Sequence, residues 1–486
     1  MRTTPIDESG GRLRWSDVYR EVELYKAAVR VYTKPLFHWR KALNVSSDGK
    51  TLYELAARGV RGLDAIHNAL VREEFQFRPA IGLKYNFNGK RRTLYIPPWE
   101  ERIVDLLLYR VLNKRLHHWF SPSSYAYRDR TYGLDSCQSR IANLLRLSAR
   151  SLYVVKRDIS DYFASISHEI LLRQLAQHVE PDDYLFQLLQ QRIRFEYQDE
   201  TGTHQAAAGI PFGCASACVL ANVYLTRLDR SMAEIPDVHY FRYADDLLLL
   251  STERESAFLA RERLCRTLRD LQLDTKLSHH ADLLLSPEAV GDPCFKTVGE
   301  FRHLGLLFQI GGKVALSVDK RRKIQNLFRF AFRRRRRAWK RITDPKERAR
   351  TLAAIASDVI EDGVRNVAII DYYLKHVTAV AQLRLLDRWL AEEVLSLVFG
   401  GHKKGHFAKL SFESLRELGL PSLVHRQRMI AHGHTKSPFF IWREQKSNRA
   451  FRGTVARLVH TVGGKQTSLD AQKQQLTMPV RDGGCL

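Results

Sequence analysis

The stretch that decides the fold is residues 238–251, VHYFRYADDLLLLS. Two apolar runs flank Tyr243-Ala244-Asp245-Asp246, which predicts two strands joined by a tight turn with acids at its tip. An isolated Asp-Asp pair is usually a solvated turn, but the four leucines that follow favour a buried hairpin. Adjacent carboxylates held between buried strands repel each other and lose hydration, so a bound cation is their natural compensation.

A third acid, Asp158, ends another β-branched run, LYVVKRDIS at residues 152–160, and a helix-like segment follows at 168–179. Two divalent cations about 3.5–4 Å apart, bridged by carboxylates, form the arrangement that enzymes use for in-line phosphoryl transfer. Mg²⁺ suits such hard oxygen ligands and completes its coordination with phosphates and water. The three acids therefore predict a magnesium site for phosphoryl transfer.

The charge of the chain indicates a polyanionic partner. The 486 residues hold 78 Lys plus Arg against 53 Asp plus Glu, a formal net charge of +25. Nucleic acid is the favoured partner, and a merely basic ribosome-associated or membrane-surface protein is the alternative. The six cysteines include no pair with zinc-site spacing, and the chain has neither an apolar signal core nor a long apolar run. We expect a cytoplasmic protein with no membrane partner.

Apolar spacing predicts an α+β chain. Residues 18–32 and 51–71 have helical periodicity, and residues 81–87 and 92–97 alternate around Asn88-Gly89 as a hairpin does. Residues 301–318 predict a second hairpin that turns at Gly311-Gly312. Beyond Ser317 the chain is helical and very basic, and its last 25 or so residues are polar.

These motifs together resemble reverse transcriptases. FRYADDLLLL is similar to the signature hairpin of that family, VVKRDISDYFASISHEIL to its first palm motif and GIPFGCASACVLANVYLTRLD to the next. GLKYNFNGKRRTLYIPPWEERIV resembles the fingers motif, and SPSSYAYRDRTYGLDS resembles a segment that follows it. LQLDTKLS and FRHLGLLF resemble the later palm elements. The seven matches occur in the family's order from about residue 75 to residue 310.

The resemblance implies a right-handed fingers–palm–thumb polymerase with a helical N-terminal extension and a helical C-terminal region. Its expected parts are an N-terminal extension at 1–70, fingers at 71–150, a palm at 151–312 with a fingers insertion at about 172–208, a basic helical thumb at 313–400 and a C-terminal extension at 401–486.

The family pattern also implies the roles of individual residues. Asp158, Asp245 and Asp246 would be catalytic and, with Ile159, would hold two Mg²⁺ ions. Phe163 matches the aromatic residue that excludes a ribonucleotide 2′-hydroxyl, although a core aromatic is the alternative.

Basic residues of the same motifs are expected to contact the substrate or template. Lys84 and Arg92 match the fingers residues that bind the incoming triphosphate. Lys276 matches a lysine proposed to protonate pyrophosphate, with a solvated lysine as the alternative. Arg128 and Arg130 would lie near the nucleotide or the template.

One substitution sets this chain apart from the pattern. Phe212 stands where the family has the glutamine of Pro-Gln-Gly, a residue beside the nascent base pair. We expect polymerisation to survive, because no metal ligand is lost, and fidelity, primer use or template preference to differ.

Residues 320–341 would form the thumb. Arg333, Arg334, Arg335, Arg336 and Arg337 would contact the phosphates of a template–primer duplex, and Phe328, Phe330, Phe332 and Trp339 would pack against it. A solvated basic helix or a localisation tract is the alternative.

The resemblance implies an RNA-directed DNA polymerase that uses an RNA template and deoxynucleotides to make DNA. Residues 400–486 show no endonuclease pattern or zinc cluster, which favours the defence-associated bacterial enzymes, many of which copy a dedicated noncoding RNA. The alternatives are a group II intron-encoded or retron-type reverse transcriptase, and a catalytically silent RNA-binding maturase.

Overall fold

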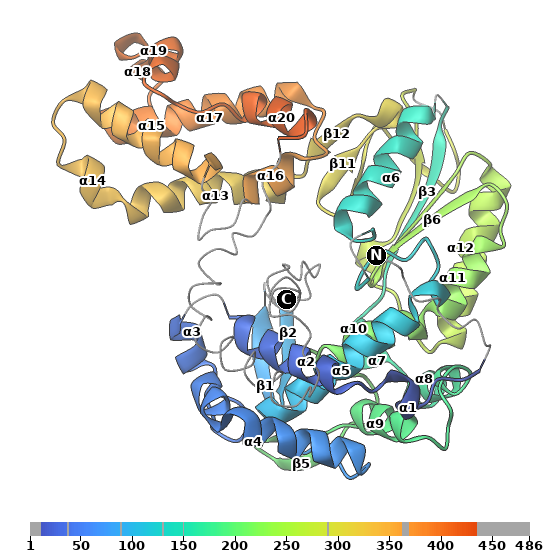
Figure 1. Ribbon diagram of the computed structural model, residues 1–486. Coiled ribbons are helices and arrows are strands. Elements are labelled where there is room, and N and C mark those ends of the chain that lie inside the picture. The colour runs from blue at the N-terminus through green and yellow to red at the C-terminus, as the bar shows by residue number, and fades with distance from the viewer. Residues whose placement is uncertain are drawn as a thin grey trace. The chain divides into compact units, whose positions relative to one another are not determined.

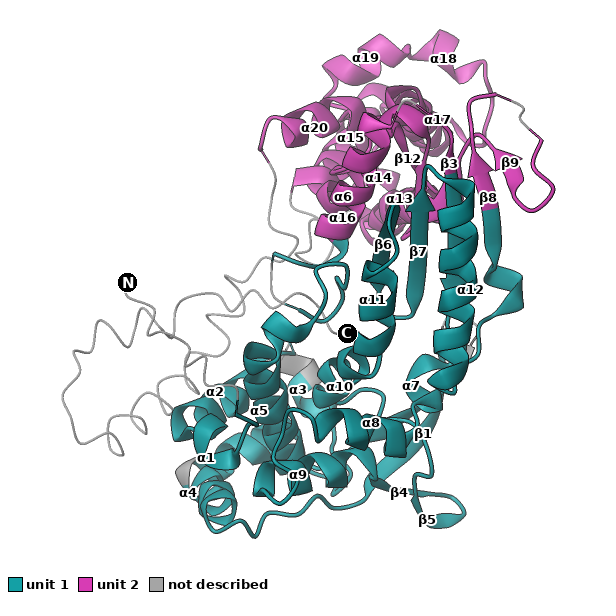
Figure 2. Ribbon diagram, turned by 90° about the vertical axis from the view of Figure 1, so that its right-hand side faces the viewer, with its two compact units in different colours: residues 1–134, 153–282, 442–486 teal, residues 135–152, 283–441 magenta. Residues whose placement is uncertain are grey.

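The computed structural model describes residues 11–35, 38–87, 90–128, 131–148, 150–288, 291–361 and 369–434 (Figure 1). The chain divides into two compact units (Figure 2). Unit 1 contains residues 1–134, 153–282 and 442–486, and unit 2 contains residues 135–152 and 283–441. The five-part division expected from the sequence stays a prediction, since the two units cut across it.

Unit 1 contains two sheets and most of the shorter helices. Its elements are α1 Trp15–Val18, α2 Glu21–Thr33, α3 His38–Leu43, α4 Leu52–Val71, β1 Ala80–Phe87, β2 Lys90–Ile96, α5 Trp99–Arg115, η1 His117–Trp119, β3 Leu152–Asp158, α7 Tyr162–Ser165, α8 His168–Leu175, α9 Tyr184–Ile193, β4 Glu196–Asp199, β5 Gly202–Gln205, α10 Ser216–Tyr224, α11 Thr226–Ala233, β6 Val238–Tyr243, β7 Asp246–Ser251, α12 Arg254–Asp270, η2 Leu277–His279 and β8 Ala281–Leu285, which runs on into unit 2.

The expected acidic hairpin lies in a five-stranded sheet of order β6-β7-β3-β8-β9. β7 pairs antiparallel with β6 on one side and with β3 on the other. Its residues after Asp246 are all buried, because α11 and α12 pack on this hairpin (Figure 2). An uninterrupted leucine run suits such a strand, which is covered on both faces.

The turn of this hairpin has only two residues. Tyr243 pairs with Asp246, which leaves Ala244 and Asp245 as the loop. Ala244 has a φ of 56°, and a positive φ at the first loop residue matches the right-handed twist of paired strands. The short turn therefore holds Asp245 at the tip, directly beside the end of β7.

The second sheet of unit 1 has the order β2-β1-β4-β5. The predicted hairpin at 81–97 is confirmed as β1 and β2, although its expected turn, Asn88-Gly89, lies outside the described residues. The hairpin β4–β5 was not predicted from the sequence. Its strands, EYQD and GTHQ, are short and half-exposed, so they lack the apolar alternation that reveals a strand.

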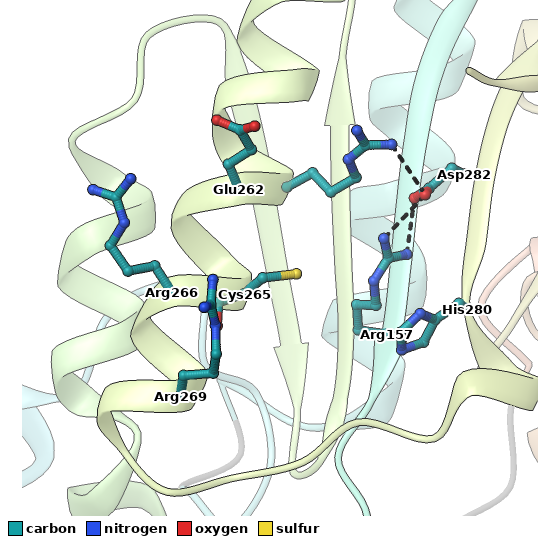
Figure 3. Close-up of a pocket in the computed structure, with 8 residues that line it drawn as sticks. Arg157, Glu262, Cys265, Arg266, Arg269, His280 and Asp282 are labelled. Carbon is teal, nitrogen blue, oxygen red and sulfur yellow. Dashed lines mark hydrogen bonds and ion pairs between the residues drawn. The ribbon is translucent and has the colours of Figure 1, made fainter. Parts of the chain in front are cut away.

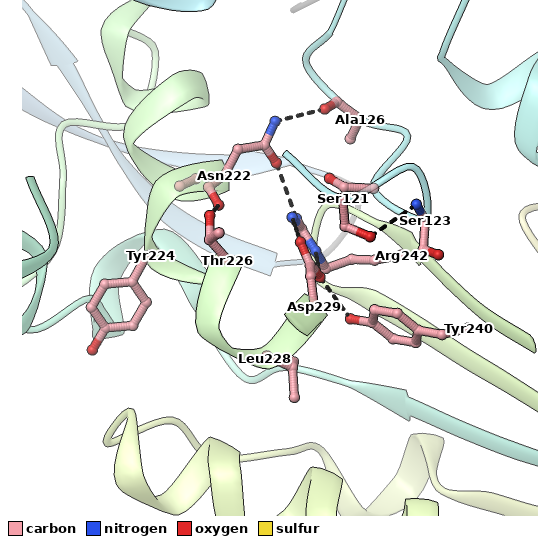
Figure 4. A network of polar contacts seen from close by, with 12 residues as sticks. Ser121, Ser123, Ala126, Asn222, Tyr224, Thr226, Leu228, Asp229, Tyr240 and Arg242 are labelled. Carbon is pink, nitrogen blue, oxygen red and sulfur yellow. Dashed lines mark hydrogen bonds and ion pairs between the residues drawn. The ribbon is translucent and has the colours of Figure 1, made fainter. Parts of the chain in front are cut away.

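A buried ion pair fixes the approach to the acidic turn (Figure 4). The fully buried Arg242 donates two hydrogen bonds to Asp229, of 2.7 and 2.6 Å, and a third to the side-chain oxygen of Asn222, of 3.0 Å. Tyr240 donates to Asp229, and Asn222 donates to the carbonyl of Ala126. Burial acts to lower the pKa of Arg242, but the adjacent Asp229 carboxylate raises it, so the guanidinium stays charged.

Unit 2 is mainly helical. Its elements are α6 Leu134–Leu147, which starts at the boundary, β9 Lys296–Val298, β10 Phe301–His303, β11 Leu306–Phe308, η3 Ile310–Gly312, β12 Val314–Leu316, α13 Val318–Arg334, α14 Arg336–Lys340, α15 Pro345–Glu361, α16 Ile369–Leu374, α17 Val380–Phe399, α18 His406–Lys409, α19 Phe412–Glu417 and α20 Leu423–Ala431. The hairpin that turns at Gly311-Gly312 is confirmed, and β10 adds a third strand to it.

The aromatic residues of the basic segment are core residues. Phe328 and Phe332 are buried on one face of α13, and Trp339 is buried and donates its indole N–H to the carbonyl of Phe332. The expectation that these three rings pack against a duplex is therefore wrong. Residues four apart share one helix face, and here that face packs on α15 and α17. Arg333 to Arg337 remain exposed.

Among the described residues, no helix is both long enough and apolar enough to cross a membrane.

The buried pair gives a first prediction. Asp229→Ala leaves the Arg242 guanidinium buried without its counter-charge, and we expect it to lower the free energy of unfolding by about 3–5 kcal/mol. Asp270, which pairs with Arg227 on the surface, is the matched control, and Asp270→Ala should cost less than about 1 kcal/mol. Urea unfolding followed by circular dichroism measures both, and equal losses would contradict this role of the pair.

Candidate catalytic site

The three acids meet at one end of the five-stranded sheet. Asp158 ends β3 and lies directly opposite Asp246, the first residue of β7, so both side chains start from the same face. The backbone N–H of Ile159 donates to the carbonyl of Asp245 over 3.1 Å, and the N–H of Lys276 donates to the carbonyl of Asp158 over 2.9 Å. The strand end is thus held between the acidic turn and the turn that carries Lys276.

Two basic side chains bind Asp158. The Lys276 ammonium donates to Asp158 Oδ1 over 2.9 Å and to the carbonyl of Ile159 over 3.0 Å. His279 Nδ1 lies 2.6 Å from Asp158 Oδ2. On the neighbouring acid, the Lys156 ammonium lies 3.7 Å from Asp246 Oδ1. Asp158 and Asp246 are therefore partly neutralised by lysines of the same unit, and His279 adds a hydrogen-bonding partner to Asp158.

Asp245 is the acid with the least compensation. Burial and the nearby negative charge of Asp158 raise the pKa of Asp245, and Asp246 adds to the effect, while Lys276 acts against it. Like charges this close favour either protonation or a bound cation.

The donor set fits divalent cations, although the described residues do not form a closed metal cluster of three or more acidic, histidine or cysteine side chains. Every candidate ligand offers a hard oxygen, and Ile159 offers one through its backbone carbonyl. The Lys276 ammonium already contacts Asp158 and that carbonyl, which shows that these two oxygens can share one cation.

An aromatic group lies beside the acids in the same unit. The half-buried rings of Phe163 and Phe212 are 5.7 Å apart and meet edge to face, and Tyr127 packs on Phe163 at 6.1 Å. The Arg92 guanidinium lies over the Phe212 ring at 5.2 Å. Phe212, the residue that departs from the family pattern, thus links the fingers arginine to Phe163.

Two glycines allow this approach. Gly209 has a φ of 84°, and a Cβ atom there would lie 2.9 Å from the Cα atom of Ala164. Gly213 has a φ of 101°, and a Cβ atom there would lie 2.6 Å from the side chain of Leu94. Gly209 is therefore required by backbone conformation and by space, and Gly213 by its backbone conformation.

The structure separates the two expected triphosphate ligands. Arg92 pairs with Tyr85 across the β1–β2 hairpin, whereas Lys84 pairs with Thr93. Because side chains alternate along a strand, Lys84 and Arg92 start from opposite faces of the hairpin. Arg92 is on the face that meets Phe212, so only Arg92 is brought to the aromatic group.

Arg128 has a structural role in this arrangement. It is buried and donates to the carbonyls of His117, Ser121 and Ser124, and its guanidinium lies 3.6 Å from the centre of the Tyr132 ring. We leave Arg128 out of the substrate-binding set proposed below. Arg130 lies outside the described residues.

Sequence reasoning missed several residues that build the site. Asn222 and Asp229 belong to the quoted motif after GIPFG but received no role, and Arg242 was regarded only as part of a strand. For Arg242 the available signal was its charge, because it lies within an apolar strand that must be buried, whereas Asp229 lies in a polar helix segment and gave no such signal. His279 gave no such signal.

Comparison of the sequence with known protein families finds one model that matches the residues of this site. Residues 84–299 match the family model described as reverse transcriptase (RNA-dependent DNA polymerase). This segment of the chain is therefore similar to a reverse transcriptase domain. All three acids, Phe163, Phe212 and Lys276 lie within the matched residues, as do Lys84 and Arg92.

Several relatives of the reverse transcriptase domain cover parts of the chain. Protein YkfC of Escherichia coli is 23% identical over 265 residues, which are 48% of this chain and 69% of that protein. The Retron Ec83 reverse transcriptase of Escherichia coli is 28% identical over 127 residues, 25% of this chain and 40% of that protein. A protein in the cob intron of Schizosaccharomyces pombe is 27% identical over 168 residues, 34% of this chain and 20% of that protein.

The solved structures that match include telomerase. The apo telomerase of Candida tropicalis, truncated from its C-terminal domain, has a TM-score of 0.41 and 10% identity, and the match covers 56% of this chain and 63% of that one. The chain thus spans only part of the length of most of these relatives.

The charge of Asp245 gives a second prediction. Its raised pKa means that the folded protein holds this proton more tightly than the unfolded chain does, so stability falls as the pH rises through the folded pKa. In metal-free buffer at neutral pH, Asp245→Asn should raise the melting temperature. This gain should become smaller as the pH is lowered toward 3.8, the ordinary pKa of aspartate. Asp274→Asn, an exposed aspartate in the Lys276 turn, is the control. An unchanged or lower melting temperature for Asp245→Asn alone would contradict the repulsion.

Proposed function

We propose that the chain is an RNA-directed DNA polymerase that adds deoxynucleotides to a primer on an RNA template. The proposal rests on one observation. Asp158, Asp245 and Asp246 lie together at one end of the five-stranded sheet, inside the segment that matches the reverse transcriptase model. The five-stranded sheet would be the palm, and the β1–β2 hairpin would belong to the fingers.

Two divalent cations, Mg²⁺ by donor chemistry, would be held by the three aspartates and the Ile159 carbonyl, and would supply the positive charge that activates the primer hydroxyl and stabilises the leaving pyrophosphate. Lys276 would then release Asp158 and Ile159, because its ammonium contacts both oxygens. The released ammonium would lie within the site and could protonate pyrophosphate, the role that the family pattern suggests.

The aromatic group would define the nucleotide pocket. Phe163 would lie against the sugar and exclude a 2′-hydroxyl, and Phe212 supports its ring at 5.7 Å. Arg92, above Phe212, would bind the triphosphate through its planar fork of donors. Lys84, on the other hairpin face, would contribute little to this step.

The basic segment of unit 2 would bind nucleic acid. Arg333, Arg334, Arg336 and Arg337 line a surface cavity of about 630 Å³ together with Lys340 and Arg341. With the rings of Phe328, Phe332 and Trp339 buried, this surface would act mainly through phosphate contacts, which do not read sequence.

We further propose a dedicated noncoding RNA as template and a role in antiphage defence, on the strength of the motif resemblance. A retron reverse transcriptase among the relatives keeps the retron-type alternative open. Sequencing of the RNA that co-purifies with the chain tests the template. One enriched species supports the proposal, and random cellular RNA contradicts it.

Primer extension on an RNA template with Mg²⁺ tests the polymerase activity itself. Asp245→Ala combined with Asp246→Ala should lower the rate by about a thousandfold or more, because the cations supply several kcal/mol of transition-state stabilisation. Asp182→Ala combined with Asp270→Ala, two exposed aspartates of the same unit, is the matched control and should retain activity. A wild-type chain that extends no RNA, DNA or protein primer would favour the silent maturase.

Phe163→Ala should admit ribonucleotides. Removal of the ring opens the space for a 2′-hydroxyl, and we expect the preference for dNTP over rNTP, measured as a ratio of kcat/KM, to fall about tenfold or more. Undiminished sugar selectivity in an active Phe163→Ala variant would assign the ring to the core instead.

The two faces of the fingers hairpin give a matched pair of variants. Arg92→Ala should raise the KM for dNTP about tenfold or more, since a charge-assisted contact to phosphate is lost. Lys84→Ala should change the same KM less than about twofold, because this side chain starts from the opposite face. Steady-state primer extension at varied dNTP concentration measures both KM values. Equal increases would contradict the prediction that only the face carrying Arg92 contacts the triphosphate.

A further inference from the structure

A second basic cavity of unit 1 lies apart from the carboxylate site. It has a volume of about 370 Å³ and lies between α12 and the segment that leads into β8, beside the end of β3 (Figure 3). Arg157 and His280 line it on one side, and Arg266 and Arg269 lie on the α12 side. None of these side chains has a role in the function proposed above.

Arg157 is the most deeply buried arginine that lines this cavity. Its side chain is only 4% exposed, and it donates to the carbonyl of Lys156 over 2.8 Å and to Asp282 over 3.1 Å. Its Nε–H is buried and has no hydrogen-bond acceptor among the described residues. A buried donor left without an acceptor is costly, and it leaves the Arg157 guanidinium only partly satisfied at the wall of the cavity.

The cavity has an excess of positive charge. Four arginines line it against only two acids, Glu262 and Asp282. Asp282 is shared, since Arg261 also lies within 3.4 Å of it. Arg266 and Arg269 are exposed and have no acidic partner within salt-bridge distance in the described part of the chain.

His280 adds a hydrogen-bonding group rather than a charge. Burial lowers the pKa of His280, and the neighbouring Arg157 lowers it further, so its imidazole is neutral at pH 7. The positive charge of the cavity therefore comes from guanidinium groups, which match phosphate oxygens in a planar, forked geometry.

We propose that this cavity is a phosphate-binding site, separate from the carboxylate cluster, that takes a phosphoryl group of a small polyphosphate or of a nucleic-acid strand. The exposed Arg266 and Arg269 bind the phosphate oxygens, and the buried guanidinium of Arg157 adds positive charge at the wall of the cavity. The volume accommodates a pyrophosphate-sized anion, whereas an apolar ligand would leave the guanidinium groups without acceptors.

The bound phosphate would contact the segments that carry the catalytic acids. Arg157 immediately precedes Asp158 on β3. His280 Nε2 lies 2.7 Å from the hydroxyl oxygen of Thr275, whose backbone pairs with Ile159. A ligand in the cavity therefore braces both β3 and the turn that carries Lys276. The site does not depend on the proposed polymerase activity, because binding requires none of the carboxylates.

Cys265 gives a local measurement of occupancy. This half-buried cysteine lines the same cavity, whereas Cys294 is exposed and lies in unit 2, so it serves as an internal control (Figure 3). The full chain is alkylated with iodoacetamide in EDTA, and the rates at the two cysteines are followed by peptide mass spectrometry. Pyrophosphate and a short single-stranded RNA are the two probes.

Pyrophosphate at twice its dissociation constant should slow alkylation of Cys265 about threefold and leave Cys294 unchanged. Arg266→Ala combined with Arg269→Ala should abolish the protection. Arg227→Ala combined with Arg263→Ala removes two arginines of α11 and α12 that do not line the cavity, and should preserve it.

Each outcome decides the proposal. Protection by pyrophosphate that needs Arg266 and Arg269 identifies a site for free polyphosphate, and protection by RNA alone identifies a site for a backbone phosphate. No protection by either probe, or equal protection in the double variant that lacks Arg266 and Arg269, overturns it. Loss of primer extension in Asp245→Ala has no bearing on this result, so the two proposals fail separately.

Discussion

The buried pair of Arg242 and Asp229 is the interaction on which the rest of unit 1 depends. A guanidinium without solvent needs a counter-charge and acceptors for its donors, and Asp229 and Asn222 supply them from α11 and α10. These contacts allow one position for β6 against the two helices, because a shift would leave a buried charge unpaired. Backbone hydrogen bonds of Arg242 with Ser123 and Tyr125 extend the constraint to the loop before α6. The loop of the acidic turn, Ala244-Asp245, begins two residues after Arg242.

The end of the sheet that carries the three acids shows the opposite electrostatic condition. Asp158 and Asp246 lie on directly opposite strand positions, and Asp245 is raised in pKa by burial and by their charge. Lys276 and His279 compensate Asp158 but leave Asp245 without a comparable partner. Opposing like charges at the ends of neighbouring strands are costly, and a bound cation, as proposed above, would remove that cost. The fully paired Arg242–Asp229 network thus supports a neighbouring turn whose acid, Asp245, lacks a comparable counter-charge.

The aromatic group links the β1–β2 hairpin to α7. Gly209 and Gly213 let the segment between them pass close to Ala164 and Leu94, and this brings Phe212 to both Phe163 and Arg92. A glutamine at position 212 would offer an amide where this chain offers a ring face. The arginine therefore lies over an aromatic surface, which restrains it without hydrogen bonds. Any difference in nucleotide selection between this chain and its relatives is expected here.

The sequence by itself determined the hairpins and the identity of the acids. Alternating apolar runs, two-residue turns and the order of motifs are local properties, so residues 81–97, 238–251 and 301–318 could be predicted as strand pairs. Only the tertiary structure decided which faces meet. The pairing register of β1 and β2 places Lys84 and Arg92 on opposite faces, and helix packing buries Phe328 and Phe332. The fold of the loop before α6 places Arg128 where it donates to backbone carbonyls. Strand register, burial and hydrogen-bond partners depend on residues distant in sequence, and no local pattern contains them.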